Sequence, residues 1–97
     1  MDKNFNKAAS HTRAYVNALR LCTDNPYGLA NLHVVAGLMC ATATEIEHFF
    51  EYAVTQRWFN YLAKTQIVCL KKEWWYVPTD DVIKDINDQI LPLYGIE

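Results

Sequence analysis

From Phe5 to Cys22, apolar or small side chains recur at spacings of three and four residues. The positions that share this spacing are Phe5, Ala8, Ala9, Thr12, Val16, Leu19 and Cys22. Because an α-helix completes a turn every 3.6 residues, these side chains fall on one face. The lysines and arginines of the segment lie mainly outside that face. The spacing predicts one long helix whose buried stripe must be covered by other elements.

Two more helices are predicted after the turn-forming segment 23–28. Asn31 is a suitable N-cap for a short helix that reaches Met39. Thr42 and Glu45 form a Thr-x-x-Glu capping box, in which Thr42 accepts from the Glu45 amide and the Glu45 carboxylate reaches back. A helix is therefore expected to begin at Ala43. Its inward face should carry Ile46, Phe49, Phe50 and Ala53, and its outward face Thr44, Glu45, Glu47, His48, Glu51 and Thr55.

The second half of the chain predicts a β-hairpin and a last helix. The runs 67–70 and 74–77 are rich in strand-forming residues and enclose the polar tip 71–73. Thr79 or Asp80 can cap a helix that Pro92 and Gly95 should stop. Its expected apolar side is Val82, Ile83, Ile86, Ile90 and Leu91. The expected fold is a single domain over 1–97, mainly α with a small β-hairpin, in the order helix-helix-helix-hairpin-helix.

One run of the sequence, VAGLMCATATEI at Val35–Ile46, resembles the pattern apolar-Ala-x-x-apolar-small-apolar-Ser-x-x-Thr-Val position by position. The run 74–79, WWYVPT, is similar to a last wing strand that leads into a capped helix. Together these runs resemble the winged helix-turn-helix family, over Leu32 to Asp80. Arg57 stands where that family usually has Gly, and the stretch 60–66 is longer than usual. An extension of the third helix to Leu62 or Ala63 is therefore left open.

The resemblance implies a small DNA-binding transcriptional regulator whose capped helix enters the major groove of double-stranded DNA. The residues it assigns to DNA contact are Thr42, Thr44, Glu45 and His48 on that helix, and Arg57, Lys64, Lys71 and Lys72 near the wing. An ordinary solubilising turn explains the two wing-tip lysines equally well. Three glutamates on the probing face fit a polyanion poorly, and the net charge of -2 gives no overall basic field.

The alternative function is a winged helix that binds a protein and no DNA. The chain has more large aromatic side chains than a core of this size needs, and adjacent strand residues point to opposite faces. At least one of Trp74 and Trp75 should then leave the core side, so Trp74, Trp75 and Tyr76 are candidate interface residues. Coverage of both hairpin faces by the terminal helices is the competing interpretation. Amphipathic terminal helices are also compatible with a homodimer.

No catalytic or metal site is predicted, so we expect neither an enzyme nor a cofactor. Glu45 and His48 have the Glu-x-x-His spacing of di-metal helical proteins, but one copy on an outward face does not make a site. Cys22, Cys40 and Cys69 are odd in number and lie among apolar neighbours. They are interpreted as buried thiols in a reducing compartment.

The sequence also predicts where the protein resides. The first residues lack the apolar run of a secretory signal. The longest apolar stretch, Leu29 to Ala43, is interrupted by Asn31 and His33 and is shorter than the roughly 20 residues of a membrane span. A cytoplasmic protein without a membrane segment is therefore expected.

Overall fold

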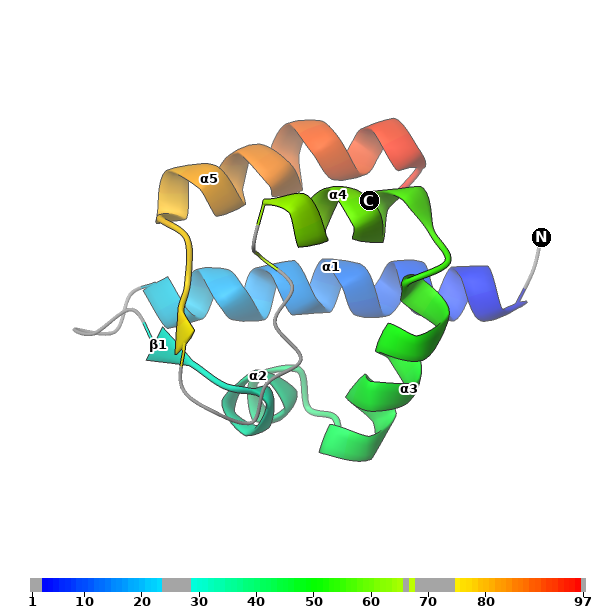
Figure 1. Cartoon of the computed structure of the whole chain (residues 1–97), viewed down its shortest axis with the longest axis horizontal. Coiled ribbons are helices and arrows are strands. Elements are labelled where there is room, and N and C mark those ends of the chain that lie inside the picture. Colours follow the sequence, from blue (N-terminus) through cyan, green and yellow to red (C-terminus); the bar gives the residue numbers. More distant parts are fainter. Residues whose placement is uncertain (1–2, 24–28, 66, 68–74, 97) are drawn as a thin grey trace.

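The computed structural model describes residues 3–23, 29–65, 67 and 75–96, which are mainly helical. The elements are α1 (Lys3–Thr23), β1 (Leu29–Ala30), α2 (Leu32–Leu38), α3 (Ala43–Ala53), α4 (Arg57–Lys64), β2 (Trp75–Tyr76) and α5 (Asp80–Asp85), continued by a π-helical turn η1 (Ile86–Ile90) and a 3-10 turn η2 (Leu91–Tyr94). In Figure 1, α1 runs through the middle, with α4 and α5 on one side and α2 and α3 on the other. The long first helix predicted from the apolar spacing is confirmed, and it is the central element of the fold.

The core is built around the predicted stripe of α1. Val16 and Leu19 are fully buried, and the neighbouring Tyr15 is only 2% exposed. The Tyr15 hydroxyl donates to the carbonyl oxygen of Ile67 at 2.7 Å, and its ring meets the ring of Phe50 edge-on at 5.3 Å. Because a buried phenol needs a hydrogen-bond partner, this bond allows a tyrosine to lie at the centre of the core.

A polar link joins α4 to α1 inside the core. The indole Nε1 of Trp58 donates to Thr12 Oγ1 at 3.0 Å, and that hydroxyl donates in turn to the carbonyl oxygen of Ala8 at 2.8 Å. Trp58 is 3% exposed and Thr12 is fully buried. The hydroxyl of Thr12, counted in the sequence as part of an apolar stripe, is therefore the acceptor that allows a tryptophan to be buried.

A separate helix follows α3, where the expected order had none. The third helix does not extend to Leu62 or Ala63, because it ends at Ala53 and Gln56 adopts an extended backbone with φ -103° and ψ 146°. A new helix, α4, then begins at Arg57 and buries Trp58, Phe59 and Leu62. The turn at 54–56 allows the apolar face of α4 to pack against the core. In one straight helix the same side chains would point in another direction.

The strand pairing also differs from the expected hairpin. β2 pairs antiparallel with β1, with Leu29 opposite Tyr76 and Ala30 opposite Trp75. The sequence analysis assigned no strand to Leu29–Ala30, because two residues are too few for a detectable alternation. Of the expected partner strand 67–70 and the tip 71–73, only Ile67 belongs to the described residues, and it is not in a strand. The observed order is α1-β1-α2-α3-α4-β2-α5.

Two of the three predicted helix caps, Asn31 and Thr42, are confirmed, whereas Thr79 occupies the N-cap position of α5 without a side-chain capping hydrogen bond. The Asn31 side chain accepts from the backbone N–H of Val34, and Thr42 Oγ1 accepts from that of Glu45 at 3.1 Å. The return contact of the capping box is made between side chains, because the Thr42 hydroxyl donates to Glu45 Oε1 at 3.2 Å. The four residues 39–42 therefore join two helices whose starts are both encoded by capping side chains.

Cys40 lies on the surface, so its interpretation as a buried thiol is wrong, whereas Cys22 is buried and Cys69 lies outside the described residues. Its backbone has φ 56°, in the left-handed region. The amide of Cys40 donates to the Gly37 carbonyl and that of Ala41 to the Ala36 carbonyl, at 3.1 and 3.0 Å. This is the Schellman pattern at the end of α2, and its left-handed position usually holds Gly.

We therefore expect Cys40→Gly to stabilise the protein by about 0.5–1 kcal/mol. The left-handed conformation costs a residue with a Cβ roughly 1–2 kcal/mol, part of which the greater freedom of an unfolded Gly takes back. Urea denaturation would measure the gain. Cys40→Ala is the matched control, because it removes the thiol and keeps the Cβ. Equal stability of the Gly and Ala variants would contradict the explanation.

The C-terminal helix agrees with its prediction except at Thr79, Val82 and Pro92. Ile83, Ile86 and Leu91 are buried as expected, but Val82 is 41% exposed and points away from the core. Pro92 does not stop the helix, since it lies inside η2, and the chain turns only at Gly95 with φ 77°. Proline is tolerated in this first turn of η2 because the Asn87 carbonyl, which the missing N–H leaves without a helical donor, accepts from Arg13 at 2.9 Å.

Candidate functional site

The outward face of α3 is the largest group of predicted contact residues in the described part of the chain. Thr42, Thr44, Glu45 and His48 are all exposed, as the capping box and the apolar spacing predicted. Ile46, Phe49, Phe50 and Ala53 are buried on the other side. The capped helix therefore presents a polar surface held in place by its apolar underside.

The charge of this surface is negative. Glu45, Glu47 and Glu51 are exposed, and α3 carries no lysine or arginine. Glu47 and Glu51 are four residues apart, and like charges at this spacing destabilise a helix by about 0.2–0.5 kcal/mol. Glu51 also lies toward the C-terminal end of α3, where the helix dipole disfavours a carboxylate. Glu45, in the first turn, is placed favourably.

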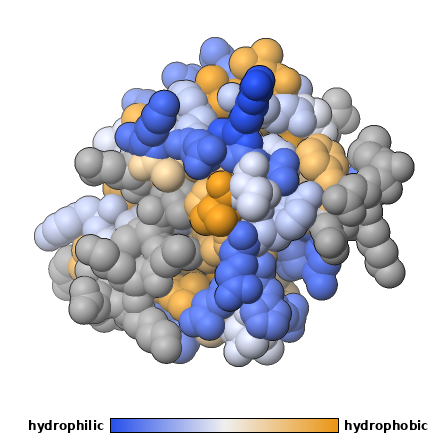
Figure 2. Space-filling view, turned by 45° about the vertical axis from the view of Figure 1, so that its right-hand side comes forward, coloured by the Kyte–Doolittle hydropathy of each residue, from blue (hydrophilic) through white to orange (hydrophobic). Residues whose placement is uncertain are grey.

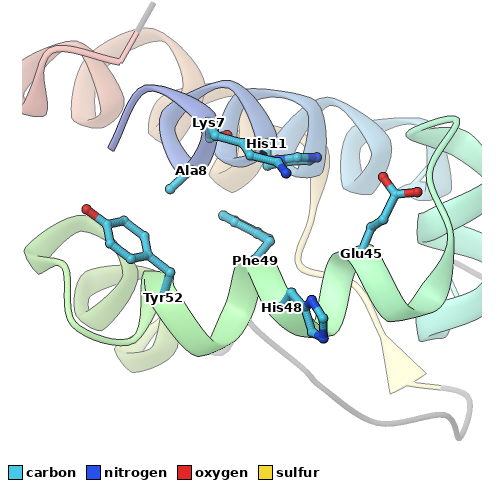
Figure 3. A pocket seen from close by; sticks show the side chains of 7 residues that line it. All are labelled: Lys7, Ala8, His11, Glu45, His48, Phe49 and Tyr52. Carbon is cyan, nitrogen blue, oxygen red and sulfur yellow. Dashed lines mark hydrogen bonds between the residues drawn. The ribbon is translucent and has the colours of Figure 1, made fainter. Parts of the chain in front are cut away.

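A hollow of about 260 Å³ lies between α1 and α3. Its lining residues are Lys7, Ala8, His11, Glu45, His48, Phe49 and Tyr52. In Figure 3, Tyr52 and Glu45 stand at opposite ends, Phe49 points toward α1, and His48 turns away from it. The rings of His11 and Phe49 are 5.5 Å apart. With one lysine and one glutamate among its lining residues, this hollow offers no single sign of charge to a ligand.

A second hollow, of about 380 Å³, adjoins α3 at Glu47, Phe50, Glu51 and Val54, which we call the outer stripe. These residues follow one another at spacings of three, one and three, so they lie on one side of the helix. Phe50 is 2% exposed and forms part of the floor, while Val54 is 47% exposed. The outer stripe combines two carboxylates with an apolar surface. Val54 was not among the predicted contact residues, although its spacing of four residues from Phe50 was a usable signal.

Two of the four predicted cationic residues lie on α4. Arg57 and Lys64 are exposed on α4, and their spacing of seven residues places them on one side of that helix. Lys71 and Lys72 lie outside the described residues. Within the described part of the chain, the ion pair that is formed joins Arg20 to Asp80 at 3.2 Å. The described cations therefore do not neutralise the carboxylates of α3 by direct pairing.

The predicted aromatic interface is divided between buried and exposed side chains. Trp75 is partly buried and packs against the core, whereas Tyr76 is 79% exposed. Trp74 lies outside the described residues. The alternation of side chains along a strand accounts for this difference, and among Trp75 and Tyr76 it is the tyrosine that faces outward.

Two kinds of reactive site, a metal centre and an activated thiol, were sought among the described residues. No group of three or more His, Cys, Asp or Glu side chains there could hold a metal ion. Burial raises the pKa of the Cys22 thiol, which disfavours the reactive thiolate. None of the described helices is long and apolar enough to cross a membrane.

The exposed apolar side chains are scattered. Figure 2 shows small hydrophobic patches separated by hydrophilic side chains over the face turned toward the viewer. The larger exposed apolar residues are Leu21, Leu38, Val54, Tyr76, Val82 and Leu93. Such patches suit contacts with single side chains better than a broad apolar interface.

Comparison of the chain with protein-family models, with curated proteins and with solved structures gave no match.

Proposed function

We propose that this protein is a winged helix-turn-helix module that binds a positively charged protein partner through the outward face of α3. The observation that carries the proposal is the charge of that face, with three exposed glutamates and no lysine or arginine. The layout of α2, a short turn, the capped α3 and the β1–β2 pair supports the assignment to this fold class.

Electrostatics favours a protein over DNA as the partner. DNA carries one negative charge per ≈ 1.7 Å of its axis, and proteins gain affinity mainly by neutralising phosphates with lysine and arginine. A glutamate can accept from a cytosine amino group, but three glutamates without a cation repel the phosphates more than they select a base. A cationic protein surface has the opposite effect, since it is attracted by all three carboxylates.

DNA binding, as expected of a transcriptional regulator, is the second candidate function. It is favoured by the exposed start of α3 at Thr42 and Thr44, and by Arg57 and Lys64 on α4. In this hypothesis Lys71 and Lys72 anchor the phosphate backbone. The homodimer expected from the terminal helices remains a prediction in both cases.

Fluorescence anisotropy of a labelled random DNA duplex separates the two functions. We expect no binding even at low salt, because the face of α3 repels the duplex. Binding at low salt that falls steeply at moderate salt would overturn the protein-partner proposal. A Lys71→Glu, Lys72→Glu variant should then lose it. A Glu45→Gln, Glu47→Gln, Glu51→Gln variant serves as the matched control, since any DNA affinity of the fold should rise when the carboxylates are neutralised.

A further inference from the structure

We infer that the outer stripe seats a basic, amphipathic segment of a partner protein, with one aliphatic side chain over Val54 and a lysine or arginine beside each of Glu47 and Glu51. The inference rests on the proposed function and deepens it, because it names the part of α3 that makes the contact and the chemistry of the segment. It distinguishes this side of the helix from the hollow beside Glu45.

The two carboxylates of the outer stripe are costly for the folded chain. Glu47 and Glu51 repel each other one turn apart, and Glu51 lies near the negative end of the helix dipole without a basic residue in the last turn. Neither forms an ion pair with a described lysine or arginine. A cationic side chain between them would relieve both costs, so the stripe gains more from a basic ligand than from solvent.

The apolar part of the outer stripe selects the partner side chain that lies beyond the two cations, over Val54. Val54 is 47% exposed, directly beside the hollow of about 380 Å³ whose floor includes Phe50. This volume is at the lower end of the range of small-molecule pockets, and its open acidic rim suits a side chain of a larger partner. Burial of an aliphatic group against Val54 would add affinity, while the two carboxylates set its orientation.

The other hollow does not offer this combination. It is lined by Lys7 as well as Glu45, so a cationic segment would meet a like charge there. Glu45 is moreover engaged by the capping contact with Thr42 at 3.2 Å. Charge complementarity therefore favours the outer stripe for a basic segment.

The test uses labelled helical peptides that carry two lysines one turn apart and a single leucine one turn beyond the second lysine, which is the order of Glu47, Glu51 and Val54 along the outer stripe. Binding to the full-length protein is followed by anisotropy at low and moderate salt. We expect saturable binding that weakens with salt. A peptide with glutamates in place of the lysines should not bind, and one with serine in place of the leucine should bind several-fold more weakly.

Variants of the protein test whether the peptide binds at the outer stripe. Glu47→Gln with Glu51→Gln should weaken peptide binding roughly fivefold to tenfold, as expected for two partly exposed ion pairs. Val54→Thr, which replaces a methyl group by a hydroxyl at equal shape, should weaken it several-fold. Glu45→Gln, which can keep the capping box, should weaken binding less than the outer-stripe variants. Asp88→Asn is the matched control, because it removes an exposed carboxylate of η1, outside the face of α3, and it should leave binding unchanged. Neutralising Glu47 and Glu51 should also raise the stability to urea slightly, which a damaged fold would not show.

The outcomes separate this inference from the proposed function. Weaker binding in Glu45→Gln, with normal binding in the outer-stripe variants, would overturn the inference and leave an acidic protein-binding face. Equal affinity for the lysine and glutamate peptides would overturn both. Absence of saturable binding to the lysine peptide at low salt would also overturn both, and a duplex that bound instead would indicate DNA.

Discussion

Trp58→Ala is expected to lower the free energy of unfolding by about 3–5 kcal/mol. Trp58 is 3% exposed, and its ring meets Phe5 edge-on at 5.4 Å between centroids. The substitution removes the largest side chain of α4 and the donor to Thr12. A domain of this size has a total stability of about 5–15 kcal/mol, so a large part of it would be lost. Urea denaturation followed by far-ultraviolet circular dichroism measures the change without depending on tryptophan fluorescence.

Trp58→Phe is the matched control for this prediction. It keeps much of the apolar ring and removes the N–H, so it should cost clearly less than the alanine variant. Thr12 would still donate to the carbonyl of Ala8, so no buried donor is left without a partner. A loss below about 1 kcal/mol in Trp58→Ala would contradict the packing of α4 on α1.

Arg13→Met is expected to lower the free energy of unfolding by about 1.5–3 kcal/mol, as is typical of hydrogen bonds to a charged group. The Arg13 guanidinium connects α1 to the end of the chain. One of its terminal nitrogens donates to the Asn87 backbone carbonyl at 2.9 Å and to the Asn87 side-chain oxygen, and the other donates to the Ile96 carbonyl at 2.7 Å. Hydrogen exchange of the amides in 86–96 should accelerate in the variant, which can be followed by mass spectrometry.

The local backbone explains why Asn87 needs this arginine. The amide of Leu91 donates to the Ile86 carbonyl in the π-helical turn, so it is not free for Asn87. The next residue, Pro92, has no N–H. The Asn87 carbonyl therefore has no helical donor and accepts from Arg13 instead.

Two controls test whether geometry or charge is responsible. Arg13→Lys keeps the positive charge but replaces the planar guanidinium by a single ammonium group. That group cannot reach all three acceptors, so the variant should lose most of the stabilisation. Arg20→Met removes an exposed ion pair with Asp80 that also joins α1 to the C-terminal helix, and it should cost less than about 1 kcal/mol. Equal losses in Arg13→Met and Arg20→Met would contradict the explanation.

Local signals in the sequence determined most of the helices. The spacing from Phe5 to Cys22 predicts α1, and Asn31 and the Thr42–Glu45 box predict where α2 and α3 begin. These features depend only on neighbours within one or two helical turns, so no tertiary information is needed. The spacing of the apolar residues in α3 also predicted that its acidic face is exposed.

Only the tertiary structure decided which elements meet. In the β1–β2 pair, Tyr76 lies opposite Leu29, 47 residues earlier in the chain (76 − 29 = 47), and no local pattern marks this partner. Trp58 is buried because Thr12 accepts a hydrogen bond from it. Arg13 is partly buried because it donates to the Asn87 carbonyl, which Pro92 leaves without a helical donor. Each of these outcomes depends on contacts between segments distant in the chain, and spacing along one helix carries no information about them.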